Sequence, residues 1–488
     1  MNQSAATIRA NIYVIFLCSV LAASIAVLIY GDTRIILGVT FVYLAYETSV
    51  SLLLFTLSAF GIKTILRERS KKKSNSLVKK PFVSVVIAAF NESSCIKDTL
   101  HSLLAQVDVS QQIIIASDGS FDGMNEMLIR DFNLQPVDEA EIHWTNRVNN
   151  DDDKTNTIEL LTLPRSGKGF ALNSGLKIAK SDVTVTLDAD TKLEPNALFE
   201  MFSEFENPQT VATGGFIYVR DAAKNRLIVR YQYVEFLRNF LWRIGLTKAK
   251  MCLQVSGAFG AFRTEILREV GGFDPKSLVE DYEIIYRLHE HLHKTNRDYK
   301  ITIATNAVAY TDSPKNPLAF VRQRTRWFAG FLQTLWQYRR MIFSTKFGNV
   351  GILMLPIKSV DAILPMWGFA SLLILLTVII FGRETYQIMA LQVFFGKWLL
   401  DITLISIMIS WHKKLFPARK FDLTTSQMIF CIMTENFLFQ PFRQIAVLNS
   451  YSWCARRVKS WNQERWLSGQ DSPKKLPSSV SYPNESEN

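Results

Sequence analysis

Two acidic residues, Asp188 and Asp190, follow a short β-rich segment at residues 183–187. Two carboxylates at positions i and i+2 beyond a strand can both reach one divalent cation. Mg²⁺ or Mn²⁺ held by few carboxylates completes its shell with water and phosphate oxygens. The spacing therefore indicates a metal-bound nucleoside diphosphate, although an isolated Asp-x-Asp also occurs by chance in many proteins.

A lysine flanked by glycines lies upstream of these acids. Gly167, Lys168 and Gly169 precede a predicted helix at residues 170–179. The free backbone N–H groups of a helix N-terminus, together with a cation, stabilise a phosphate. Lys168 is therefore a candidate phosphate ligand.

Polar residues also follow two apolar segments. Residues 82–90 form a continuous apolar run of the kind that a parallel strand buried on both faces requires, and they end at Asn91 and Glu92. The apolar segment 113–116 leads into Asp118. Ligands of open α/β sheets bind beyond the carboxyl ends of the strands, so these side chains are expected around one crevice. The alternative is that they are ordinary turn residues.

Three further motifs precede the last apolar segments: Ser256 and Gly257, Glu280-Asp281, and Gln323-Arg324-Thr325-Arg326-Trp327. With the motifs above, and in the same order, they resemble the D, DxD, ED, QxxRW signature of membrane-embedded family 2 glycosyltransferases. Hyaluronan, chitin, cellulose and poly-N-acetylglucosamine synthases belong to that family. The resemblance covers residues 81–345 in motifs and the flanking helices in architecture.

The resemblance implies an α/β fold of the GT-A (Rossmann-like) type that binds a UDP-sugar, with UDP-N-acetylglucosamine favoured and UDP-glucose next. It implies Asn91, Glu92 and Asp118 at the nucleoside and Lys168 near the phosphates. The metal, Mg²⁺ or Mn²⁺, would be held by Asp190 with help from Asp188, which would also face the nucleotide sugar.

The same resemblance implies an inverting transfer in which Asp281, beside Glu280, is the general base for the acceptor hydroxyl. Gln323 and Arg326 would hold the diphosphate leaving group, since a planar guanidinium suits phosphate oxygens. Trp327 would offer a flat face to the acceptor sugar, and Ser256 and Gly257 would lie at the acceptor end of the site. The alternative for Trp327 is anchoring at a membrane interface.

Apolar segments flank this region. Residues 12–30 form an uncharged run of membrane-spanning length, and residues 35–60 follow after a short link, so we expect residues 1–61 to form a transmembrane hairpin. Residues 62–80 are predicted to be a basic linker, which the positive-inside rule places in the cytosol. A cleaved signal peptide is the alternative for the first run.

Further apolar spans are predicted at residues 363–382 and 386–411, the second followed by basic residues. Residues 348–362 suit a helix lying at the interface. Residues 423–448 are polar for a membrane span. A single crossing would put the basic tail outside the cytosol, against the positive-inside rule. Two alternatives stay open: the segment crosses only partway and returns, or the rule fails here. The predicted parts are a GT-A domain at 81–345, interfacial and transmembrane helices at 346–450, and a partly disordered tail at 451–488.

The composition supports a membrane protein. Hydrophobic residues make up 48% of the 488 and charged residues only 20%, and the net charge of +11 is concentrated beside the apolar spans. Lipid headgroups account for that charge, so nucleic acid is not expected as a partner. Five scattered cysteines indicate neither disulfides nor a zinc site, and the histidines at 289, 291 and 293 are expected at the surface.

The leading hypothesis is a processive synthase in a bacterial inner or plasma membrane, with its catalytic domain in the cytosol. It would extend a growing β-linked glycan and pass it through its own helices. One alternative is a non-processive transferase that glycosylates a lipid acceptor at the cytosolic face. A second is a transporter or receptor that senses a nucleotide sugar. The tail is too short for a cyclic-di-GMP-binding domain, so such regulation would need an accessory membrane subunit.

Overall fold

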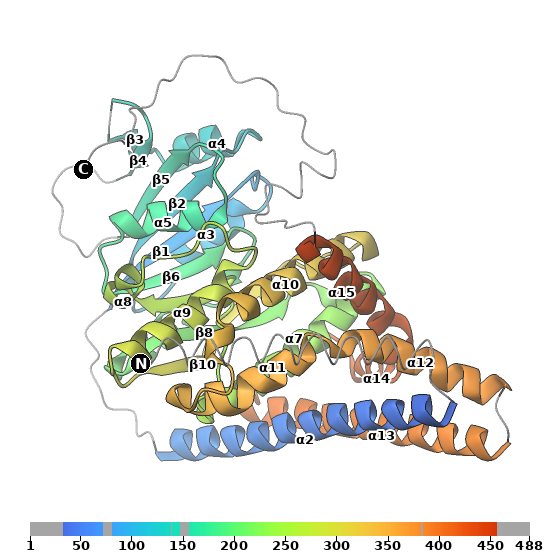
Figure 1. The fold of residues 1–488 in the computed structure, drawn as a ribbon. Coiled ribbons are helices and arrows are strands. Elements are labelled where there is room, and N and C mark those ends of the chain that lie inside the picture. The colour runs from blue at the N-terminus through green and yellow to red at the C-terminus, as the bar shows by residue number, and fades with distance from the viewer. Residues whose placement is uncertain (1–32, 72–80, 138, 147–155, 382–383, 456–488) are drawn as a thin grey trace.

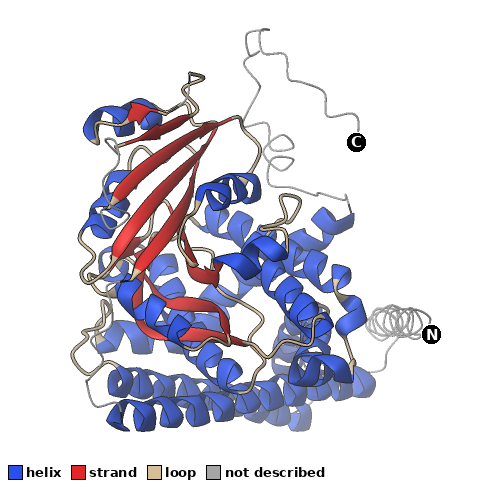
Figure 2. Ribbon diagram, turned by 90° about the vertical axis from the view of Figure 1, so that its left-hand side faces the viewer, coloured by secondary structure: helices blue, strands red, loops and turns tan. Residues whose placement is uncertain are grey.

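The computed structural model describes residues 33–71, 81–137, 139–146, 156–381 and 384–455. A mixed sheet with helices on both faces lies beside a layer of long helices (Figures 1 and 2). The predicted span at 12–30 and most of the predicted tail lie outside the described residues.

The sheet has the strand order β3-β4-β5-β2-β1-β6-β9-β8-β10-β7. Strands β5, β2, β1 and β6 are mutually parallel, and β9 joins β6 to β8 through antiparallel pairs. The strand bounds are β1 Phe82–Ala89, β2 Ser110–Asp118, β3 Gln135–Pro136, β4 His143–Thr145, β5 Thr157–Leu163, β6 Val183–Asp188, β7 Lys192–Leu193, β8 Thr210–Val219, β9 Phe259–Arg263 and β10 Lys300–Thr311.

Strand β1 is buried on both faces, as its continuous apolar run predicts. Val85 packs into the cluster on one face of the sheet and Val86 into the cluster on the other. Helices α3, α4 and α6 cover the first face, and α5, α8 and α9 cover the second. The helix bounds are α3 Ile96–Leu104, α4 Met124–Asp131, α5 Lys168–Ile178, α6 Ala197–Ser203, α7 Leu227–Lys248, α8 Thr264–Glu269, α9 Glu280–Lys294 and α10 Pro317–Gln337.

The remaining helices form the second layer, in which α2 and α13 lie side by side along the bottom of Figure 1. Two described helical stretches, Thr40–Arg69 and Glu384–Leu415, are long and apolar enough to cross a membrane by length and composition. The bounds in this layer are α2 Thr33–Lys71, α11 Leu355–Asp361, α12 Leu364–Phe381, α13 Glu384–Leu415, α14 Thr425–Thr434 and α15 Gln440–Ala455.

Helix α2 continues past the predicted boundary at residue 61, so the first half of the predicted basic linker is helical up to Lys71. Residues 423–448 form two helices, α14 and α15, joined by the π-helical turn Glu435–Phe439. Helix α14 packs against α7, and α15 packs against α10 and α12. This segment is therefore a broken helix held against the rest of the protein.

The expectation of surface histidines is wrong for His289. Its ring lies between the Tyr299 hydroxyl at 2.6 Å and the Cys252 carbonyl oxygen at 2.8 Å, and it is 4% exposed. Burial lowers the pKa of His289 to about 4, so the ring is neutral at pH 7 and serves packing.

Candidate active site

One cavity of about 760 Å³ begins at the carboxyl end of β6 and continues between α7, α10 and the long helices. Most of the predicted site residues line it: Lys168, Asp188, Asp190, Ser256, Gly257, Glu280, Asp281, Gln323, Arg326 and Trp327. Asn91, Glu92 and Asp118 follow or end the neighbouring strands β1 and β2 and are not part of the lining.

Asp118 shapes the turn that presents Lys168. Its carboxylate accepts hydrogen bonds from the backbone N–H of Ser166 at 2.6 Å and of Gly167 at 3.0 Å, and it pairs with Arg165 at 2.7 Å. Gly167 has a φ of 100°, a conformation that glycine adopts without strain. The predicted contact of Asp118 with a nucleoside stays a prediction, while its part in fixing the start of α5 is visible.

Lys168 joins the two acidic motifs. Its Nζ lies 2.8 Å from Asp188 Oδ1 and 2.9 Å from Glu280 Oε1. Burial alone would lower the pKa of Lys168, but the charges of Asp188 and Glu280 outweigh it and hold the pKa above its usual value. The side chain is therefore a fixed cation at the start of a helix, where a phosphate would be stabilised.

Asp190 lies close to Asp188 and is half-buried. Burial and the charge of Asp188 raise the pKa of Asp190 to about 7, against a hydrogen bond of 3.1 Å from the Thr311 hydroxyl. Two carboxylates that repel each other in this way fit a divalent cation. Within the described ranges no group of three or more His, Cys, Asp or Glu side chains could hold a metal ion.

Asp281 occupies the first turn of α9, next to Glu280. The backbone N–H of Gly257 donates to Asp281 Oδ2 at 2.7 Å, and a Cβ at Gly257 would come within 3.0 Å of the Asp281 Cβ. Burial and the charge of Glu280 raise the pKa of Asp281 to about 6. A carboxylate with a pKa so close to neutrality is suited to take a proton from a hydroxyl.

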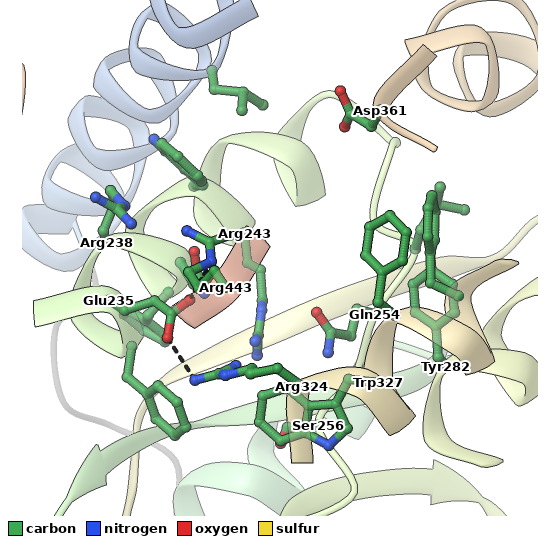
Figure 3. A pocket seen from close by; sticks show the side chains of 18 of the residues that line it. Glu235, Arg238, Arg243, Gln254, Ser256, Tyr282, Arg324, Trp327, Asp361 and Arg443 are labelled. Atoms are coloured by element: carbon green, nitrogen blue, oxygen red, sulfur yellow. Dashed lines mark hydrogen bonds and ion pairs between the residues drawn. The ribbon is translucent and has the colours of Figure 1, made fainter. Parts of the chain in front are cut away.

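The QxxRW motif lies on α10, which begins at the N-cap Asn316 followed by Pro317. Arg326 donates to the Leu278 carbonyl oxygen at 2.9 Å. The Arg324 guanidinium lies 4.2 Å from the centre of the Trp327 ring, and both side chains line the cavity (Figure 3). Trp327 packs against the cluster that contains Leu278 and Val279.

The sequence analysis missed the wall supplied by α7. Glu235, Arg238, Asn239, Trp242, Arg243 and Leu246 all line the cavity. Glu235 pairs with Arg324 at 2.6 Å (Figure 3). Arg238 holds Glu435 through two contacts of 2.9 Å. Their spacing of three and four residues was the available signal, because it places polar side chains on one face of a helix.

A second feature that the motifs did not reveal is a ring–guanidinium stack near the strand ends. Arg165, which pairs with Asp118, lies 3.3 Å from the centre of the Phe90 ring. Phe90 meets Phe121 edge to face at 5.9 Å, and Phe121 is 76% exposed. These flat groups stand beside Asn91 and Glu92, where the resemblance puts a nucleoside.

Residues 183–432, just over half of the chain, match the family described as "Glycosyl transferase family group 2", and residues 84–271 match "Glycosyl transferase family 2". The chain therefore belongs to family 2 of the glycosyltransferases and is a glycosyltransferase.

Named relatives fit this assignment. The chain is 30% identical over 254 residues to a poly-beta-1,6-N-acetyl-D-glucosamine synthase of Staphylococcus epidermidis, covering 51% of this chain and 54% of the relative. It is 29% identical over 284 residues to the enzyme of the same name from Staphylococcus aureus, covering 55% and 60%. The matched region therefore spans little more than half the length of these relatives.

A solved structure shares the fold. It is the mannosyltransferase PcManGT of Pyrobaculum calidifontis in complex with GDP-Man and Mn²⁺, with a TM-score of 0.50 and 17% identity. The match covers 77% of this chain and all of that one. The GT-A type of fold implied by the motifs is thus supported by the structure.

Proposed function

We propose that this protein is an inverting, metal-dependent polysaccharide synthase embedded in a membrane. It would use a UDP-sugar, with UDP-N-acetylglucosamine first, to extend a β-linked glycan at the cytosolic face and pass it across. The observation that carries this proposal is the continuous cavity that runs from the Asp188–Asp190 carboxylates past Asp281 to α2 and α13.

The donor would lie with its base at the Phe90–Arg165 stack and its diphosphate at the start of α5. Arg165 and Phe90 offer flat faces suited to a nucleobase. A divalent cation on Asp190 and Asp188 would neutralise the diphosphate, consistent with the Mn²⁺ and GDP-Man in the mannosyltransferase structure. Lys168 would bind a phosphate oxygen, exchanging part of its present pairing with Asp188 and Glu280 for contact with the phosphate.

The transfer step is a single displacement. As the acceptor hydroxyl oxygen forms its bond to the anomeric carbon, its proton passes to Asp281 and the bond from that carbon to the diphosphate oxygen breaks. The Gly257 N–H keeps the Asp281 carboxylate oriented. Arg326, held by the Leu278 carbonyl, would stabilise charge on the departing nucleoside diphosphate. Inversion at the anomeric carbon of an α-linked donor gives a β-linkage.

The far end of the cavity supports passage of the glycan. It is lined by polar side chains of α2, α13 and α15, among them Tyr43, Glu47, Lys397, Asp401 and Arg443. Lys397 lies 2.6 Å from Asp401 and 3.9 Å from Glu47. Charged side chains in apolar helices of this length face one another or a polar path, and a hydrated polymer needs such a path.

The test is to reconstitute the full chain in sealed vesicles with its catalytic side outward and to supply radiolabelled UDP-sugars one at a time. We expect polymer from one donor, dependence on Mg²⁺ or Mn²⁺, and product that added glycosidase digests only after the vesicles are opened. One sugar per lipid acceptor would instead identify the non-processive transferase. Polymer digested in intact vesicles would remove the passage across the membrane.

A further inference from the structure

A second cavity, separate from the first, lies between the C-terminal parts of α2 and α13. It is an open groove of about 340 Å³, and its walls are Ala59, Ile62, Lys63, Leu66, Arg67, Trp411 and Lys414. The α2 residues lie on one helix face, because their spacing is three and four residues. Phe55 stacks on Trp411 with ring centres 4.6 Å apart and so fixes the two helices side by side next to the groove.

The groove is positively charged. Lys63 and Lys414 are exposed, and within the described part of the chain neither makes an ion pair or a hydrogen bond. Arg67 adds a third cation to the walls. The nearby carboxylate of Glu68 is engaged by Lys248 at 3.1 Å, so it does not neutralise the two lysines.

The groove also lies at a boundary in polarity. On the N-terminal side of the basic residues, α2 exposes Leu52 and Phe60, and α13 exposes Leu399 and Ile407. If the charged group of an amphipathic anion lies at Lys63 and Lys414, its apolar chains would therefore lie along these apolar side chains. Trp411 has the amphipathic ring that proteins place at the level of lipid headgroups.

We propose that this groove binds one anionic phospholipid, with its phosphodiester between Lys63 and Lys414 and its acyl chains along α2 and α13. The proposal rests on the membrane embedding that forms part of the proposed function. It adds a lipid site that lies outside the catalytic cavity and involves no sugar. Basic pockets between membrane helices on the cytosolic side bind acidic headgroups in this way.

The experiment titrates short-chain phosphatidylglycerol into the detergent-solubilised full chain, without sugar donor, and counts bound lipid by native mass spectrometry. We expect one saturable site. The double variant Lys63→Gln with Lys414→Gln should bind about 30-fold more weakly, because each lysine near an anionic headgroup contributes about a fivefold change in affinity. Lys63→Arg with Lys414→Arg keeps both charges and should retain binding.

The matched control is Lys413→Gln with Lys420→Gln, which removes the same charge from the same end of α13 and its loop but not from the groove. It should bind like the wild type. Equal loss in this control, or equal binding of phosphatidylcholine with the same chains, would overturn the site. Equal binding of free glycerol phosphate would overturn the assignment to a lipid. Because glycosyl transfer is measured separately, failure of the proposed function and failure of this site give different results.

Discussion

The two ends of the main cavity are built in different ways. At the sheet, its charges sit at the ends of strands and the starts of helices, where Lys168, Asp188 and Asp281 come together from distant parts of the chain. At the long helices, its charges project from the middle of helices and already form pairs, such as Arg238 with Glu435. The sheet end is organised to receive charged ligands. At the helix end, basic and acidic side chains pair with one another.

This difference indicates a division of labour. A site in which one lysine bridges close carboxylates binds a charged ligand strongly and responds to proton and metal concentration. A wall of paired charges offers hydrogen bonds to a neutral glycan without holding it by net charge. Substitutions can separate the two ends of the cavity. Changes at the sheet end should alter the rate of transfer and donor binding. Changes at the helix end should alter protein stability and product length.

The largest effect is expected from Asp281→Asn. The amide keeps the shape but cannot take the acceptor proton, so kcat should fall by about 10²- to 10⁴-fold while donor binding stays within a few-fold. Rates at saturating donor and equilibrium binding of UDP measure the two quantities. Asp298→Asn, an exposed site beyond the end of α9, is the control. Turnover within tenfold of wild type would exclude Asp281 as the base.

Removal of a metal ligand comes next. Asp190→Ala should weaken metal-dependent nucleotide binding by more than about 100-fold, because losing even an outer partner of a metal ligand costs 10- to 100-fold. Calorimetric titration with UDP, with and without Mn²⁺, measures the change. If the affinity of the variant for UDP still rises on adding metal as it does in wild type, Asp190 does not hold the ion.

At the other end, Glu235→Gln should mainly destabilise the fold. Glu235 and Arg324 have side chains only 4% and 11% exposed, so the change leaves a buried guanidinium without its partner. Breaking such a pair costs about 3–5 kcal/mol of the free energy of unfolding. Thermal unfolding of the solubilised chain measures this cost. The double variant Glu235→Gln with Arg324→Met should recover part of the loss, and equal melting of all three would show that the pair is not structural.

The same contrast explains what the sequence could predict. Strand β1 was predictable from its continuous apolar run, and the short motifs, which are local signals, pointed to residues that the structure gathers around one cavity. The ion pairs of the α7 wall were not predictable, because the partner of Arg238 lies almost two hundred positions away at Glu435 and only tertiary packing brings them together. Likewise Asp118 was predictable as a strand-end residue, but its hold on Ser166 and Gly167 depends on the turn geometry.

The pH dependence of turnover should follow Asp281. A general base works only when deprotonated, so activity is present above the pKa of about 6 and is lost as the pH falls below it. The rate should fall about tenfold for each pH unit below that value. Rates at saturating donor between pH 4.5 and 8 check this, with Asp281→Asn as the control. A wild-type profile that stays flat to pH 4.5 would contradict the assignment.

The smallest effect is expected at Trp327, which lies where the two ends meet. Its ring is covered by Arg324 on one side and lines the cavity. In Trp327→Ala, a sugar stacked on the ring would lose a contact worth about 0.5–1.5 kcal/mol. The affinity for each acceptor should therefore fall a few-fold. Because that loss recurs at every addition, chains should become shorter while transfer of the first sugar is little changed. Trp327→Phe keeps an aromatic face and should give intermediate lengths on a sizing gel. If both variants make chains of wild-type length and only the yield of folded protein falls, Trp327 is an anchor and not part of the acceptor site.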